Sequence, residues 1–208
     1  QTEYFELLVN FDQAKDHAQK KFYYEKILSS KRSKVKEIDR QHYEFYTKWY
    51  YTAVREILDI YSFCGKHPDD FKELAKQVAP PITPAEAEKS IRFLEKAGFI
   101  ARDKSGVYRQ TDPFITTGYQ AQAVSFHNFQ IATAELAKQA IDRFPKDKRC
   151  IATVTMSLSN DGFEKAKERL KMFNRELMEI ARDCHDRDRI YHFNFHVFPM
   201  SKLPENKK

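Results

Sequence analysis

Between Tyr46 and Gly98, apolar residues recur every three or four positions, and this spacing predicts three consecutive helices. The first helix has a wide aromatic face. Such a face could stack bases or a planar ligand, but at helical spacing it is more often part of a core. We therefore expect it to form the centre of the fold. Its apolar residues are Tyr46, Trp49, Tyr50, Ala53, Val54, Ile57 and Tyr61, broadened by Tyr43 and Phe45.

The second and third helices are bounded by strong start and stop signals. The second is predicted to begin after His67 and to end before Pro80, because proline cannot continue a helix. The third begins at Thr83, whose side chain can cap the amide of Glu86 while the Glu86 carboxylate reaches back. A proline fills the first helical position, and Gly98 supplies a left-handed residue at the end.

A β-hairpin is predicted directly after the third helix. Phe99–Arg102 and Val107–Gln110 flank the polar loop Asp103–Gly106, whose glycine can take the positive φ of a tight turn. Three helices followed by a hairpin is the order of a winged helix-turn-helix. The sequence therefore predicts such a domain over residues 43–116.

The rest of the chain divides into two further segments. Residues 117–208 predict a C-terminal α/β module of helix, strand, helix and strand, with strands at Cys150–Leu158 and Ile190–Phe198. Residues 1–42 predict a helical hairpin and a basic linker, Ser29–Lys36, which is either a solvated connector or an arm that contacts phosphates. The expected fold class is α+β, mainly helical. The chain starts at Gln1 inside a helical pattern, so we expect a longer polypeptide upstream.

The charge pattern permits nucleic-acid binding but does not require it. The chain has 36 basic and 30 acidic residues and a pI near 9.1. The third helix has as many acids as bases, whereas the wing is basic. The candidate nucleic-acid-binding residues are Lys89, Arg92, Arg102, Lys104 and Arg109. Direct DNA contact and a winged helix used only for packing or dimerisation both stay open.

Two groups of residues in the C-terminal module have side chains of the types that bind ligands or act in catalysis. His192, Asn194 and His196 alternate with aromatics and share one strand face, where they could line a ligand pocket or a polar sheet surface. The two histidines would lie ~13 Å apart on a strand, too far to bind one metal. Cys184, His185 and Asp186 are adjacent, and neighbours in sequence point apart, which favours a loop over a catalytic triad.

No signature of an enzyme, a cofactor site or a membrane span is present. The sequence lacks a Gly-rich phosphate loop, a nucleophile elbow and a zinc-protease motif. Its three cysteines form no metal or disulfide pattern, which favours a reducing cytoplasm. No window approaches the ~20 apolar residues of a transmembrane helix. We expect no catalytic residues, no metal and no cofactor.

Five segments resemble an uncharacterised family of bacterial proteins. They are Glu3–Phe11, His42–Leu58, Ile82–Ile100, Tyr108–Pro113 and Phe195–Lys202. The resemblance implies an N-terminal helix-turn-helix of the phage-repressor type upstream, and a role as a transcriptional regulator. It implies no catalytic or ligand-binding residue.

Together these observations predict the C-terminal regulatory region of a bacterial transcriptional regulator, acting in sensing or dimerisation. The expected partners are DNA, mainly through the upstream domain, a second copy of the chain, and a small-molecule or protein effector. The alternative is a protein–protein interaction module that uses its winged helix without touching DNA.

Overall fold

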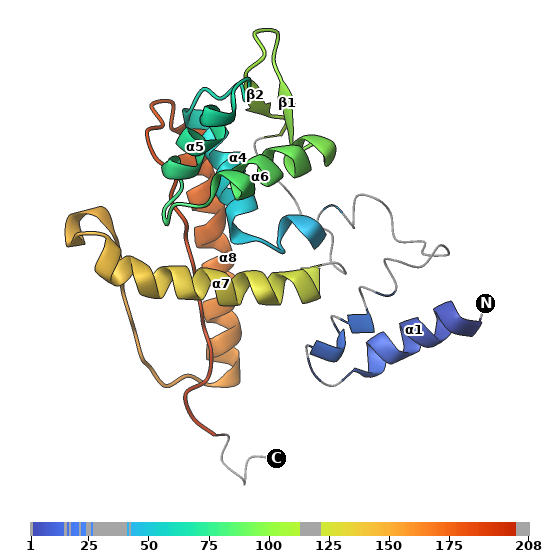
Figure 1. Ribbon diagram of the computed structural model, residues 1–208. Helices are drawn as coiled ribbons and strands as arrows, with labels where there is room; N and C mark the ends of the chain where they lie inside the picture. Colours follow the sequence, from blue (N-terminus) through green and yellow to red (C-terminus); the bar gives the residue numbers. More distant parts are fainter. Residues whose placement is uncertain are drawn as a thin grey trace.

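The fold is mainly helical with one small antiparallel sheet, which confirms the α+β class (Figure 1). The computed structural model describes residues 2–14, 16, 18–20, 22–23, 26, 41, 43–112 and 122–202. Its elements are α1 (Thr2–Gln13), α4 (Trp49–Ile60), α5 (Pro68–Gln77), α6 (Pro84–Lys96), β1 (Ile100–Arg102), β2 (Tyr108–Gln110), α7 (Gln122–Arg143), the 3-10 helix η1 (Lys146–Lys148) and α8 (Asn160–Asp183).

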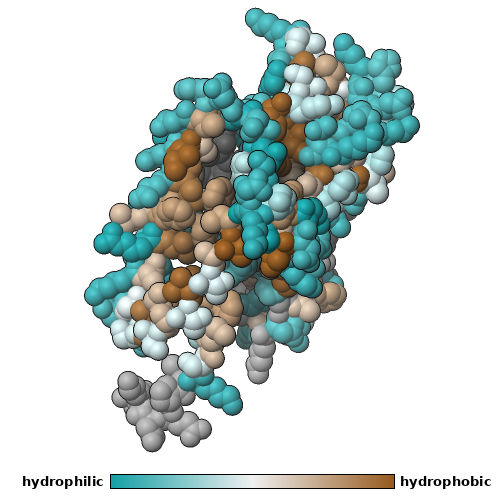
Figure 2. Space-filling view, turned by 90° about the vertical axis from the view of Figure 1, so that its left-hand side faces the viewer, coloured by the Kyte–Doolittle hydropathy of each residue, from teal (hydrophilic) through white to brown (hydrophobic). Residues whose placement is uncertain are grey.

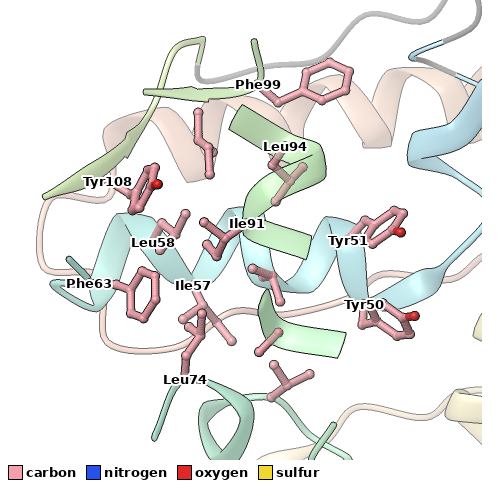
Figure 3. Close-up of a cluster of buried hydrophobic side chains, with 14 of the residues drawn as sticks. Tyr50, Tyr51, Ile57, Leu58, Phe63, Leu74, Ile91, Leu94, Phe99 and Tyr108 are labelled. Atoms are coloured by element: carbon pink, nitrogen blue, oxygen red, sulfur yellow. The ribbon is translucent and has the colours of Figure 1, made fainter. Parts of the chain in front are cut away.

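The three helices α4, α5 and α6 enclose one hydrophobic core, which the hairpin β1–β2 closes (Figure 3). The aromatic helix is central to it, as predicted. It starts three residues later than Tyr46, because Thr47 folds back on the carbonyl of Glu44 and Lys48 is extended. The most completely buried residues are Tyr51, Val54, Ile57, Leu58, Phe63, Leu74, Val78, Leu94 and Ile100.

Helix α6 has the predicted ends. The Glu86 amide donates to Thr83 Oγ1 at 3.2 Å, and the Thr83 amide donates to the Glu86 carboxylate at 2.8 Å. After Lys96, Gly98 adopts a φ of 75°, which L side chains rarely take. The helix therefore turns sharply into β1 and carries its apolar side, Ala87, Ile91 and Leu94, into the core.

The hairpin forms at the predicted place, with strands one residue shorter than expected, and is fastened to the helices on one face. Ile100 pairs with Gln110 and Arg102 with Tyr108, and Gly106 in the turn has a φ of 83°. The Tyr108 amide donates to the Phe63 carbonyl at 2.9 Å, and its hydroxyl donates to Glu95 at 3.0 Å. Burial is the main reason that the pKa of Tyr108 is raised.

The two strands predicted in the C-terminal module are not formed, so the helix-strand-helix-strand prediction was wrong in half of its elements. Residues 150–158 and 190–198 are extended, but neither is paired in a sheet within the described part of the chain. Alternating apolar residues favour an extended backbone, whereas a strand also needs a hydrogen-bonded neighbour. The helices α7 and α8 are present, although α8 buries none of its residues.

Within the described residues, contacts at a few positions join the C-terminal half to the core around the α4–β2 unit. Phe126 and Phe129 of α7 pack edge-on against Tyr46, with ring centroids 5.2 and 5.1 Å apart. The Arg187 guanidinium forms an ion pair with Asp59 of α4. Ile190 packs against the main core. These contacts are few compared with those inside the α4–β2 unit.

At the N-terminal end, the first predicted helix is present as α1. The second helix of the predicted hairpin is described only in part, and residues 18–20, 22–23 and 26 are helical. The basic linker Ser29–Lys36 lies outside the described residues. Among the described helices, none combines the length and apolarity that crossing a membrane would require.

Replacing Leu94 by Ala is expected to lower the free energy of unfolding by about 2–5 kcal/mol, because it leaves a cavity at a fully buried position. Urea denaturation measures this loss. Glu88→Ala, on the exposed side of the same helix, is the matched control and is expected to change stability by less than about 0.5 kcal/mol. Equal effects of the two substitutions would contradict the assigned core.

Candidate nucleic-acid interface

The outward side of α6, opposite its buried residues, carries the helix's basic side chains. Lys89, Arg92 and Lys96 lie three or four residues apart and therefore form one stripe. This stripe forms one wall of an open groove of about 490 Å³. The groove is lined by Gln41, Glu44, Ala85, Glu88, Lys89, Arg92, Phe93, Lys96 and Ala97. Residues of both charge signs line it, so it is not a purely basic channel.

The cations of this stripe differ in their availability. Arg92 is held by Glu88 in an i, i+4 ion pair of 2.5 Å. Lys89 and Lys96 have no ion pair within the described residues. Lys96 was missed as a candidate from the sequence, although its position four residues after Arg92 could have identified it. The two lysines are thus the cations of α6 most able to meet a phosphate.

The hairpin separates two arginines that the sequence analysis grouped together. In the register of the sheet, Arg102 shares the inner face with Tyr108, whereas Arg109 lies on the outer face beside Ala101. Arg102 donates to the Cys64 carbonyl at 2.7 Å and to the Gly106 carbonyl at 3.1 Å. Its guanidinium also lies 4.2 Å from the centre of the Tyr108 ring. Arg102 therefore fastens the hairpin to the loop after α4.

The tip of the hairpin is organised by Asp103. Its carboxylate accepts from the side chain and amide of Ser105, the amide of Val107, and Arg109 Nε at 3.4 Å. These bonds, first among them that from the Ser105 hydroxyl, lower the pKa of Asp103 from 3.8 to about 2. Arg109 is partly neutralised by this carboxylate. Lys104, next to it, has no ion pair within the described residues.

A buried arginine that the sequence analysis did not single out fixes the base of the hairpin. Arg55 of α4 is only 2% exposed, and its guanidinium bonds to Glu56 at 2.5 Å and to the Asp112 carbonyl. Gln110 donates in turn to the Arg55 carbonyl at 3.1 Å. The sequence holds a signal for this burial, because Arg55 directly follows the buried Val54 on a helix with a wide apolar face. These bonds attach the end of the hairpin to α4.

The aromatic residues of α4 pack into the core and present no stacking platform for bases. Tyr51 is 1% exposed and stacks on Phe93 with ring centroids 4.6 Å apart. Burial raises the pKa of Tyr51 to about 12, so its hydroxyl stays protonated at any physiological pH. Tyr51 is thus a buried core residue that stacks on Phe93.

The second candidate set lies along the extended segment 190–198. The ring of His192 meets Phe129 of α7 edge-on at 6.2 Å, and burial lowers its pKa below 6.5. The Asn194 amide nitrogen is buried without a hydrogen-bond partner among the described residues. His196 is exposed. The three residues follow one face of the segment, but the groove described above lies elsewhere, so their role as a ligand pocket stays a prediction.

The adjacent Cys184, His185 and Asp186 form the loop that follows α8. Cys184 is exposed, its amide donates to the Ile180 carbonyl, and its own carbonyl accepts from Arg187. No group of three His, Cys, Asp or Glu side chains in the described residues is arranged to hold a metal ion. The contacts of this loop assign it to the end of α8.

Comparison with known proteins identifies one family. Residues 29–200, most of the chain, match the family described as a domain of unknown function, DUF4423. No curated protein matches the chain.

Removing Arg102 should loosen the hairpin, whereas removing Arg109 should not. Arg102→Ala is expected to cost about 1 kcal/mol of stability, because it deletes backbone hydrogen bonds and a cation–π contact. Arg109→Ala, the matched control with the same loss of charge, should cost less than about 0.5 kcal/mol. Amide exchange at Tyr108 reports the difference. An effect of Arg109→Ala as large as that of Arg102→Ala would contradict the assignment.

The turn around Asp103 should weaken in acid. Because the folded pKa of about 2 lies below the ordinary 3.8, its contribution is present above pH 3.8 and is lost as the pH falls toward 2. Asp103→Asn keeps the shape but removes the charge. The melting temperature of the wild type should exceed that of this variant at neutral pH, and the gap should close near pH 2. A gap that does not depend on pH would show that the charge contributes nothing.

Proposed function

We propose that this chain, which belongs to the DUF4423 family, is the regulatory region of a transcriptional regulator. In this proposal the α4–β2 unit is a winged helix with α6 in the recognition position and the hairpin as its wing. The C-terminal region acts in sensing or self-association. The supporting observation is the order of three helices and a fastened hairpin around one core.

The distribution of charge limits what the winged helix would do by itself. Neutralisation of phosphates by Lys and Arg side chains dominates the affinity for nucleic acid. The logarithm of the affinity therefore falls with the logarithm of the salt concentration, with a slope that scales with the number of phosphates contacted. Arg92 and Arg109 are ion-paired, and Arg102 is bound to backbone carbonyls. On α6 and the hairpin, the described cations left for phosphates are Lys89, Lys96 and Lys104. Any DNA contact by this unit would thus be weak and non-specific, and would add to contacts made elsewhere in a longer regulator.

The second candidate function is a protein-interaction module that uses the winged helix without touching DNA. The mixed charge of the groove beside α6 favours it. Glu44 and Glu88 line that groove together with the lysines, and carboxylates repel a phosphate backbone. A protein partner with both charge signs would meet no such repulsion.

Duplex binding measured by fluorescence anisotropy separates the two candidates. The chain is expected to bind a mixed-sequence DNA duplex at low salt, with affinity falling steeply as salt rises. The triple variant Lys89→Ala, Lys96→Ala and Lys104→Ala should reduce the slope of log affinity against log salt by about 2–3, because three phosphate contacts are lost.

The matched control removes three exposed lysines away from α6 and the wing. Lys138, Lys146 and Lys148 lie on α7 and η1, and replacing them by Ala changes the net charge by the same amount. Their loss should leave the salt slope within about one unit. An equal reduction of the salt slope in both triple variants would show that DNA binding depends on the overall charge of the chain and not on α6 and the wing. No binding at low salt by the wild type would remove DNA contact and leave the protein-interaction module.

A further inference from the structure

The C-terminal half of the chain exposes the apolar side chains that a folded protein normally buries. Of the large apolar residues exposed in the described part of the chain, all but Phe22 lie between Phe126 and Met200. None lies in the α4–β2 unit. Val154 and Met156 are 74% and 64% exposed. Figure 2 shows hydrophobic side chains gathered across the middle of one face, between hydrophilic margins.

Helix α7 carries three of these exposed residues, Phe126, Ile131 and Ile141, and the others in this half belong to three segments. On the segment 150–158 they are Ile151, Val154, Met156 and Leu158; on α8 they are Met172, Phe173, Met178 and Ile180; and on the segment 190–200 they are Tyr191, Phe193, Phe195, Val197, Phe198 and Met200. Together they expose apolar surface on the order of 1,000 Å², given the size of such side chains. The largest apolar patch on a typical monomer is roughly 300–600 Å².

The two extended segments have no backbone pairing partner within the described residues. Within the described residues, no backbone hydrogen bond joins either segment to another part of the chain. Both run in the direction opposite to α8, one before it and one after it (Figure 1). In the first segment aliphatic residues alternate with polar residues, and in the second segment aromatic residues alternate with polar residues. Both patterns have the two-residue period of a strand. Their edges are therefore open to pairing with another chain.

Helices already lie on both faces of the second segment. Phe195 packs edge-on against Phe173 of α8, with centroids 5.8 Å apart. On the opposite face, His192 meets Phe129 of α7. A segment that has helices on both faces but open edges has the surroundings of an inner strand of a sheet. What it lacks is a neighbouring strand on each side.

The chemistry of this face matches a second copy of the chain. Neither 150–158 nor 190–198 contains a Lys, Arg, Asp or Glu, so nothing in them attracts nucleic acid or a charged peptide. Helix α8 carries six basic and six acidic residues, which allows two copies to approach without net repulsion. The aliphatic strand and the aromatic strand are complementary, because aromatic and β-branched residues pair favourably across strands. Both belong to this chain, yet no backbone hydrogen bond joins them within its described residues.

We propose that residues 150–200 form the interface of a homodimer, in which the segments 150–158 and 190–198 of one copy pair as strands with those of the other. The apolar side of α8 then covers the shared sheet. The available area suits the purpose, since a stable interface buries about 800 Å² on each partner and homodimer interfaces are the more apolar ones. A two-fold axis supplies both missing neighbours at once. The proposal rests on the self-association part of the proposed function and is independent of DNA contact.

The mass of the chain in solution tests the pairing first. Sedimentation at micromolar concentration is expected to give twice the chain mass of 24.6 kDa. Val154→Asp and Phe193→Asp each place a charge on a face that the dimer buries, and each should yield a monomer. Thr155→Asp, the matched control on the opposite face of the first segment, should leave the dimer intact. A monomeric wild type, or a dimer that survives both substitutions, would overturn the proposal.

Amide exchange of the unaltered chain gives a readout that does not depend on any variant folding. The amides of 150–158 and 190–198 are expected to be protected at high concentration and to exchange faster on dilution, because pairing across copies is lost with the dimer. Protection that does not change with dilution would mean pairing within one chain and would overturn the proposal. Fast exchange in a dimer would place the interface elsewhere and overturn it too. Neither measurement involves DNA, so failure here leaves the winged-helix proposal standing.

Discussion

The burial of one side of α6 against α4 and α5 is the interaction on which the rest of the structure depends. A helix of 13 residues is marginally stable alone in water, so α6 exists because Ile91 and Leu94 are buried. That burial decides which residues face outward, and it turns Lys89, Arg92 and Lys96 into a single stripe. The hairpin adds to the same core through Ile100 and Tyr108. The candidate interface is thus a consequence of packing.

The C-terminal half, in contrast, leaves many of its large apolar side chains exposed. Its long helix α8 is amphipathic, but among the described residues its apolar side stays largely exposed. Its contacts with the α4–β2 unit, through Tyr46, Asp59 and Ile190, anchor this half without burying it. Ordering a segment of chain costs conformational entropy, and favourable contacts must offset that cost. For this half, such contacts could form in an assembly of two copies. The folded α4–β2 unit is thus joined to the region for which we propose dimerisation.

Much of the α4–β2 unit could be predicted because its signals are local. The reciprocal cap of Thr83 and Glu86, the prolines that bound the helices and the positive φ of Gly98 and Gly106 each act over a few residues. The strands predicted at 150–158 and 190–198 are not formed, because alternation favours an extended backbone and says nothing about what lies beside it. The role of the candidate nucleic-acid-binding residues stays a prediction. Basic residues are visible in the sequence, but the ion pairs of Arg92 and Arg109, and the inward turn of Arg102, depend on three-dimensional neighbours.

The most direct test of this account is cross-linking of a mixture of ¹⁴N- and ¹⁵N-labelled chains, read by mass spectrometry, since only contacts between copies join peptides of different isotope. The chain offers lysines close to the proposed interface, at Lys146, Lys148 and Lys202, and lysines far from it in sequence, at Lys72 and Lys76 on α5. The account predicts mixed-isotope links among the first group and only single-isotope links within the second. Single-isotope links throughout, or mixed links confined to α5, would contradict it.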